Sequence, residues 1–91
     1  MEDRRILIPK ELLGKSDLKK VEQIIITLND NGILLIPYQD DYKEFNVLGI
    51  RSLDKGRFSL PNNIRIPVKE LVPVLYRGKI WIKRCVLWTH L

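Results

Sequence analysis

The sequence predicts a mostly β (α+β) fold, and three observations carry that prediction. The chain of 91 residues contains 12 Ile, 14 Leu and 6 Val but no Ala, which is the best helix former. Short apolar runs alternate with turn signals, of which Asn31-Gly32 is the strongest. A pattern of strand, turn and hairpin occurs twice, and neither copy is large enough to bury its apolar side alone. We therefore expect a single domain, residues 1–91, built as one barrel from two internal repeats.

The first elements are short. Residues 5–9 predict an apolar strand that is ended by a proline, and a helical turn over 10–13 follows, with Gly14 as its stop. Ser16 has the chemistry of an N-cap, and it predicts a second short helix over 17–21.

A buried hairpin comes next. Residues 23–28 form a β-branched run without alternation, which is typical of a strand buried on both faces. The turn over 29–32 leads into a return strand over 33–36. A polar, acidic connector over 38–44 ends the first half.

The second half repeats this plan. Its predicted strands span residues 45–53, 57–61, 71–76 and 79–83. Pro73 lies inside the third strand, which indicates either a sheet edge or a bulged position. We expect a three-residue turn over 54–56, because this length sorts polar and apolar side chains onto separate faces and leaves Gly56 at a left-handed position. Arg51 and Arg57 then project from one side of one hairpin.

The two halves can be aligned. Residues 5–12 match 57–64 at a spacing of 52 residues, and residues 32–36 match 78–82 at a spacing of 46. The first copy is therefore six residues longer between these two matches. This alignment predicts an internal duplication.

The two repeats, residues 1–44 and 45–91, differ in charge. Residues 1–45 hold 7 Lys/Arg against 9 Asp/Glu, whereas 46–91 hold 9 against 2. A basic half of this kind is typical of proteins that bind a polyanion. The alternative is a surface whose cations only keep a small protein soluble.

Cationic and amide side chains surround the predicted hairpin of the second half. The set comprises Arg51, Lys55, Arg57, Asn62, Asn63 and Arg65. Arginine forks bind phosphate or guanine edges, and asparagine reads adenine. Asp54 is placed to orient Arg57 or Lys55, and Gly56 makes the turn. The set predicts a DNA-binding face, and the alternative is a solvated hairpin.

Other kinds of chemistry find little support. Cys85 and His90 could form a nucleophilic pair, but we interpret Cys85 as a buried structural residue and His90 as part of a frayed chain end. No cluster has metal-ligand spacing and no glycine-rich loop could hold a phosphate, so we expect no metal, no cofactor and no enzyme. Trp81 and Trp88 fit core or interface anchors better than base-stacking platforms. No apolar run approaches the roughly 20 residues of a membrane span. A single cysteine cannot form an internal disulfide, which favours the reducing environment of the cytoplasm.

Residues 49–65 resemble the signature of the SpoVT-AbrB domain family. The shared features are an arginine, a hydrophobic-Asp pair, a Gly-Arg turn, a strand ending in proline, and a hydrophobic-Arg pair. The two-copy layout is similar to that of the MraZ branch. This resemblance implies a swapped-hairpin fold and a DNA-binding transcriptional regulator. It also implies that Arg51, Arg57 and Arg65 contact DNA and that Asp54 is the turn aspartate.

The sequence departs from this family pattern in both copies. Two residues separate Asp54 from Arg57, where the family has three. In the first copy Arg4 stands in place of the turn glycine, and Leu13 stands in place of the last arginine. We therefore expect the first copy to be structural and the second copy to bind DNA.

The functional expectation is a cytoplasmic, nucleoid-associated regulator that binds double-stranded DNA as a homo-oligomer, a dimer or larger. We expect the protein to bind neither a membrane nor a small-molecule substrate. The alternative is an antitoxin-like interaction module whose basic surface binds an acidic protein partner.

Overall fold

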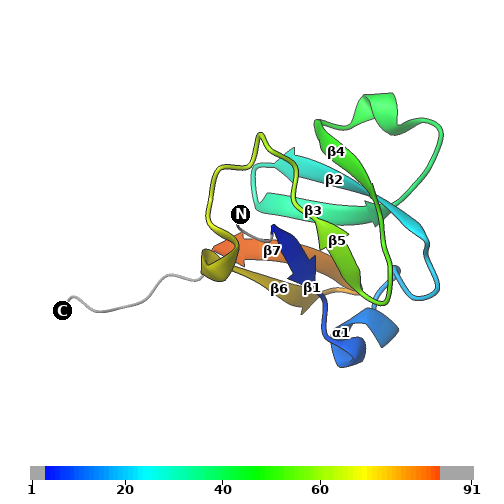
Figure 1. The fold of residues 1–91 in the computed structure, drawn as a ribbon. Coiled ribbons are helices and arrows are strands. Elements are labelled where there is room, and N and C mark those ends of the chain that lie inside the picture. The colour runs from blue at the N-terminus through cyan, green and yellow to red at the C-terminus, as the bar shows by residue number, and fades with distance from the viewer. Residues whose placement is uncertain (1–3, 85–91) are drawn as a thin grey trace.

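The computed structural model describes residues 4–84 and is mostly β, as predicted (Figure 1). Its strands are β1 (Arg5–Leu7), β2 (Gln23–Asn29), β3 (Gly32–Pro37), β4 (Val47–Ser52), β5 (Arg57–Ser59), β6 (Leu71–Tyr76) and β7 (Lys79–Arg84). Its helical elements are α1 (Lys10–Gly14) and the 3-10 turns η1 (Tyr42–Glu44) and η2 (Val68–Glu70). None of the helices within residues 4–84 has the length and apolar character needed to cross a membrane. The predictions for Cys85, Trp88 and His90 lie outside the described residues.

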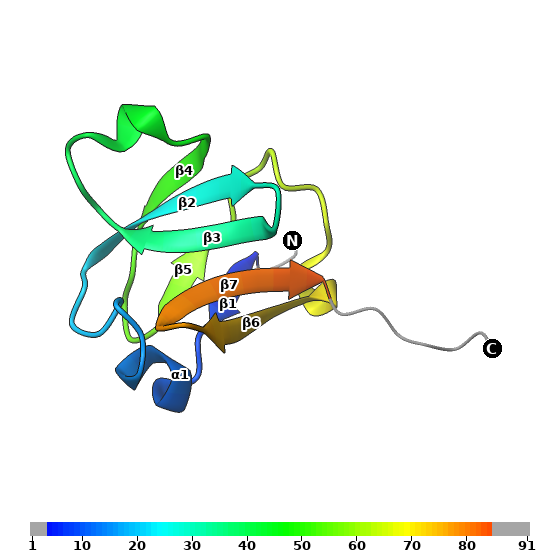
Figure 2. The ribbon, with the colours of Figure 1, turned by 180° about the vertical axis from the view of Figure 1, so that it is seen from behind.

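The strands form two layers. β1 and β5 make a two-stranded ribbon, and the other strands make a five-stranded antiparallel sheet in the order β4-β2-β3-β7-β6. The ribbon lies in front of the sheet in Figure 1, and the sheet faces the viewer in Figure 2. Apart from the β2–β3 and β6–β7 hairpins, each pairing joins a strand of the first half to a strand of the second. The two halves are therefore interlocked.

The hydrophobic core fills the space between ribbon and sheet. Ile6 and Phe58 pair across the ribbon, and both side chains are buried. They belong to one cluster with the inward side chains of the sheet, which are Ile24, Ile26, Ile33, Leu35, Leu71, Ile80 and Ile82. Folding thus buries β-branched and leucine side chains from both halves in one core. Each half therefore depends on the other to cover its apolar side chains.

Two predictions about individual strands are confirmed. Residues 24–27 of β2 are buried on both faces of the sheet, as the run without alternation indicated. β6 is an edge strand, as Pro73 indicated, because a proline cannot donate to a neighbouring strand.

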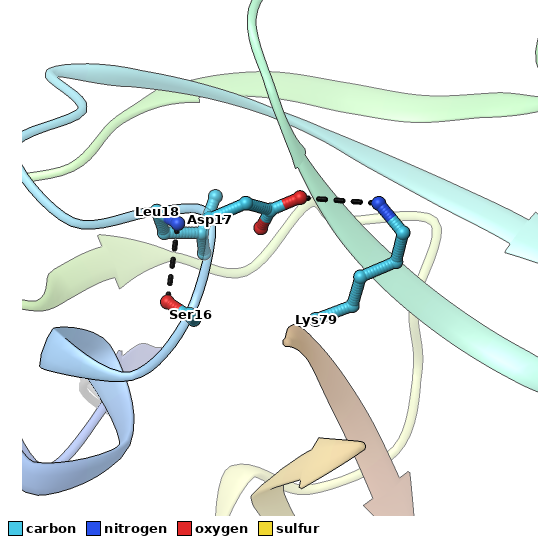
Figure 3. Close-up of polar contacts among 4 residues, drawn as sticks. All are labelled: Ser16, Asp17, Leu18 and Lys79. Atoms are coloured by element: carbon cyan, nitrogen blue, oxygen red, sulfur yellow. Dashed lines mark hydrogen bonds and ion pairs between the residues drawn. The ribbon is translucent and has the colours of Figure 1, made fainter. Parts of the chain in front are cut away.

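The helix predicted after Ser16 is not present, and the segment forms turns instead. The Ser16 hydroxyl accepts a hydrogen bond from the Leu18 backbone N–H at 3.1 Å (Figure 3). The Asp17 backbone N–H donates to the Gly78 carbonyl at 2.8 Å, and the Asp17 carboxylate pairs with Lys79 at 3.1 Å. The segment therefore combines local turn bonds, such as Val21 N–H to the Leu18 carbonyl at 3.1 Å, with contacts from Asp17 to the β6–β7 turn.

The three-residue turn expected over 54–56 is wrong, because the chain makes a two-residue turn. Asp54 and Arg57 exchange both backbone hydrogen bonds, at 2.9 and 2.8 Å. Lys55 and Gly56 between them have φ values of 52° and 82°, as in the type I′ turns that match strand twist. Beyond this bridge the strands part, since β4 pairs with β2 and β5 pairs with β1. The expectation that Arg51 and Arg57 project from one side of one hairpin fails for the same reason.

The strand registers correct the alignment of the two halves by one residue. Asn29 and Gly32 close the turn of the first hairpin, and Tyr76 and Lys79 close that of the second. Gly32 therefore corresponds to Lys79 and not to Gly78. With this shift, buried positions of β3 match buried positions of β7. The internal duplication stays a prediction, with this register as its alignment.

Candidate nucleic-acid interface

The outward face of the β1–β5 ribbon carries two arginines. Arg5 pairs with Ser59, and Leu7 pairs with Arg57, so these four side chains share the exposed face. Arg5 and Arg57 are diagonal neighbours across the two strands, a separation that long side chains can bridge. One arginine comes from each half of the chain.

These arginines line a shallow pocket of about 390 Å³ together with Ile6 and Leu7. Leu7 is 52% exposed, which is high for a leucine. The exposed Lys55 lies in the turn at the end of the ribbon. A two-stranded ribbon fits the DNA major groove, which is about 12 Å wide. The face can therefore present cations to phosphates and guanidinium forks to base edges.

Gly56 allows the turn to approach the other strand of the ribbon. A Cβ at this position would lie 2.7 Å from the Ile8 carbonyl oxygen. The Ile8 backbone N–H donates to the Gly56 carbonyl at 2.8 Å, which continues the pairing of β1 with β5. In this structure the Asp54 carboxylate forms no ion pair with Lys55 or Arg57, and Asp54 is bonded to Arg57 through the backbone.

Arg51 lies apart from this face. It pairs with Ile24 and so sits on the core side of the sheet, where it is half-buried. Its Nη1 donates to the Ile50 carbonyl at 2.9 Å. A Cβ at Gly49 would lie 2.7 Å from the Pro61 ring and 3.3 Å from the Arg51 guanidinium. Arg51 is therefore packed between β4 and the loop after β5.

The remaining predicted residues stand on that loop. Asn62, Asn63 and Arg65 are all exposed. The Asn63 side-chain amide donates to the Leu48 carbonyl at 3.2 Å, which ties the loop to β4. The predicted set thus divides into a ribbon group, with Lys55 and Arg57, and a loop group, with Asn62, Asn63, Arg65 and Arg51.

Arg4 connects the ribbon to the loop. Its Nη2 donates to the carbonyls of Pro61 and Ile64, on either side of the two asparagines. Its own carbonyl accepts from the Leu60 backbone N–H at 2.8 Å. The residue that replaces the turn glycine in the first copy therefore fixes the loop of the second.

We expect Arg4→Met to lower the free energy of unfolding by about 1–2 kcal/mol, because it leaves the Ile64 carbonyl without its donor and the Pro61 carbonyl with only the Ile64 N–H. Urea denaturation measures this change. Arg57→Met is the matched control, and its exposed side chain predicts a change within about 0.5 kcal/mol. Equal effects of the two substitutions would show that the Arg4 contacts do not stabilise the loop.

Arg5 is the residue that the sequence-based set did not include. Its signal was present, since residues 5–12 align with 57–64 and this places Arg5 at the position of Arg57. The acidic balance of the first half argued against a binding role for that half. The pairing of β1 with β5 brings Arg5 and Arg57 to one surface, whatever the net charge of the first half.

Fold and surface together define a small, mostly β protein whose halves interlock behind an arginine-bearing ribbon. Residues 3–43 match a family described as antidote-toxin recognition MazE, bacterial antitoxin. This match supports the AbrB/MazE-like superfamily that residues 49–65 indicated, although it falls on the half that we expected to be degenerate. It does not establish a two-copy arrangement like that of MraZ. Searches of curated proteins and of solved structures give no match.

Proposed function

We propose that this protein is a DNA-binding regulator and that the outward face of the β1–β5 ribbon is its DNA contact. The observation that carries the proposal is the placement of Arg5 and Arg57 on one exposed ribbon face, with Lys55 at its end. The match to the MazE family supports a DNA-binding antitoxin or regulator in general terms. A single ribbon offers a small contact area, so we also propose that more than one copy binds each operator.

A titration of duplex DNA at several salt concentrations tests this proposal. If Arg5, Lys55, Arg57 and Arg65 each contact a phosphate, the slope of log affinity against log salt is about −3 to −4. Fluorescence anisotropy with a pool of random duplexes, followed by selection of the bound sequences, would measure both affinity and specificity. Absence of binding at about 50 mM salt would contradict the proposal, because cation–phosphate contacts are strongest at low salt.

A second candidate function is that of an antitoxin-like module that binds a protein partner. The observation in its favour is the description of the family that residues 3–43 match. The two functions are compatible on one chain only if they use different surfaces, since a polyanion on the ribbon would compete with an acidic protein there. A competition experiment between duplex DNA and an acidic partner separates the two cases.

A further inference from the structure

A second surface lies at the outer edge of β6, a strand of the five-stranded sheet that has no part in the ribbon. The two hairpins of the sheet pair with each other through β3 and β7, which leaves β2 and β6 on the outside. β4 covers the outer edge of β2, whereas no strand within residues 4–84 covers the outer edge of β6. The two edges occupy equivalent places in the two hairpins (Figure 2).

The covered edge shows which backbone groups of β6 are open. The Leu28 N–H donates to the Asn46 carbonyl at 2.9 Å, and the Glu22 carbonyl accepts from Leu53 at 2.8 Å, so even-numbered residues of β2 point toward β4. The turn registers place Leu75 at the equivalent of Leu28. Leu71, Pro73 and Leu75 therefore direct their backbone groups toward the open edge. The Leu71 N–H is already bonded to the Val68 carbonyl in η2, so Leu75 offers the open N–H and all three residues present a carbonyl.

Pro73 has no N–H and lies at the equivalent of Ile26. In the covered hairpin, the pairing of β2 with β4 shifts register between Ile26 and Thr27. An added strand with a bulge opposite Pro73 would fit β6 in the same way, because a bulge leaves one position unpaired and so requires no N–H from Pro73. A second copy of β6 fits poorly, because a two-fold arrangement centred on Pro73 would set two prolines opposite each other.

The side chains beside this edge are apolar and cationic. Val72 is 37% exposed and Tyr76 is 58% exposed, and both lie on the face of β6 that points away from the core. Next to them is a groove of about 460 Å³, lined by Asn31, Val74, Leu75, Tyr76, Trp81 and Lys83. Lys83 lies over the Trp81 ring at 5.0 Å and donates to the Asn31 carbonyl at 2.6 Å. The groove has room for the side chains of an added strand.

The charge of this surface favours an acidic occupant. Asp17 pairs with Lys79 at 3.1 Å (Figure 3), and Glu70 pairs with Arg84 at 2.8 Å. Three further cations on the β6–β7 hairpin and its approach have no carboxylate partner among residues 4–84, and these are Lys69, Arg77 and Lys83. An acidic segment would gain these contacts, and a basic one would be repelled.

From the open edge, the groove and the charge we infer that β6 accepts an extended segment of a partner protein that alternates apolar and acidic side chains. The segment adds antiparallel to β6 as β4 adds to β2, and main-chain hydrogen bonds supply affinity while the groove and the cations supply selectivity. This inference does not rest on DNA binding. It gives the antitoxin-like alternative a surface separate from the ribbon.

Synthetic peptides of about ten residues test the inference, with the full chain labelled with ¹⁵N. The probes alternate Val with Glu, Val with Gln or Val with Lys. We expect the Val/Glu peptide to bind at least about tenfold more tightly than the Val/Lys peptide and to protect the Leu75 amide from hydrogen exchange. Val72→Glu should weaken Val/Glu binding by about tenfold or more, and Phe45→Ser, at a site 41% exposed elsewhere, should not change it.

Four results would overturn the inference. They are absence of Val/Glu binding, equal binding of all three peptides, peptide-induced chemical shifts confined to the ribbon, and protection of the Leu75 amide that rises with protein concentration alone. The third result would identify a polyanion effect on the ribbon, and the fourth would identify a second copy as the occupant. Failure of the protein to bind DNA would leave the peptide result unchanged, so the two proposals can fail separately.

Discussion

Removal of both ribbon arginines, in Arg5→Ala/Arg57→Ala, is expected to abolish measurable DNA binding near physiological salt. Each arginine that contacts DNA contributes about 1–3 kcal/mol, and one comes from each strand of the ribbon. Each single substitution should therefore weaken binding by roughly 5- to 150-fold, and the double substitution should multiply these effects unless the two side chains share one phosphate. The salt slope should become shallower by about one for each phosphate contact removed.

A control variant outside the ribbon makes this result specific. Arg77 is exposed in the β6–β7 turn, with its guanidinium 5.3 Å from the Tyr76 ring. Arg77→Ala removes one positive charge, as each ribbon variant does, and should leave affinity nearly unchanged. Arg65→Ala reports on the loop separately, since a loss of about 1–3 kcal/mol there would extend the interface beyond the ribbon. Unchanged affinity in both ribbon variants would place the DNA contact elsewhere.

Local sequence signals predicted the elements that local physics decides. Asn31-Gly32 and Arg77-Gly78 marked the two hairpin turns, and Pro73 marked the sheet edge. The β-branched run of β2 marked a strand buried on both faces. In each case neighbouring residues suffice, because turn geometry and strand burial depend on short stretches of chain.

Long-range pairing decided the features that the sequence did not reveal. The expected turn over 54–56 assumed that β4 and β5 pair along their length, but each pairs with a strand of the first half instead. The segment after Ser16, where a helix was expected, also bonds to a distant part of the chain, the β6–β7 turn. Such partners lie 20 to 29 residues away in the chain for β4, and 50 or more for β5 and Asp17. Neither the composition nor the periodicity of the sequence identifies them.

The candidate site shows the same division. Arg57 and Lys55 were found from their spacing, and they lie on the exposed ribbon and its turn. Arg51 was grouped with them by proximity in sequence, yet it faces the core side of β4. Arg5 belongs to the half that was expected to be structural, because that half departs from the family pattern and is acidic on balance. A shared surface depends instead on which strands pair. The spacing of residues in sequence therefore grouped Arg51 with Arg57, whereas the interlocked topology places Arg5 beside Arg57.

Gly56→Ala should destabilise the fold by about 3 kcal/mol. Two costs add at this position, since Gly56 has a φ of +82° and an added Cβ would lie 2.7 Å from the Ile8 backbone oxygen. A backbone atom cannot move aside as a flexible side chain can, so the ribbon itself must shift. Urea denaturation gives the free energy, and hydrogen exchange at the Ile8 amide, which bonds to the Gly56 carbonyl at 2.8 Å, reports the local change.

Gly78→Ala separates these two costs. Gly78 has nearly the same backbone angle, with a φ of +78°, and the second position of its two-residue turn, but an added Cβ there would meet nothing within 4 Å. It should therefore show only the cost of a left-handed alanine, about 1 kcal/mol. The difference between the two variants measures the close approach of the Lys55-Gly56 turn to β1. If the two alanine variants lose equal stability, the ribbon tolerates that contact, and the junction between the halves is looser than the Ile8–Gly56 distance implies.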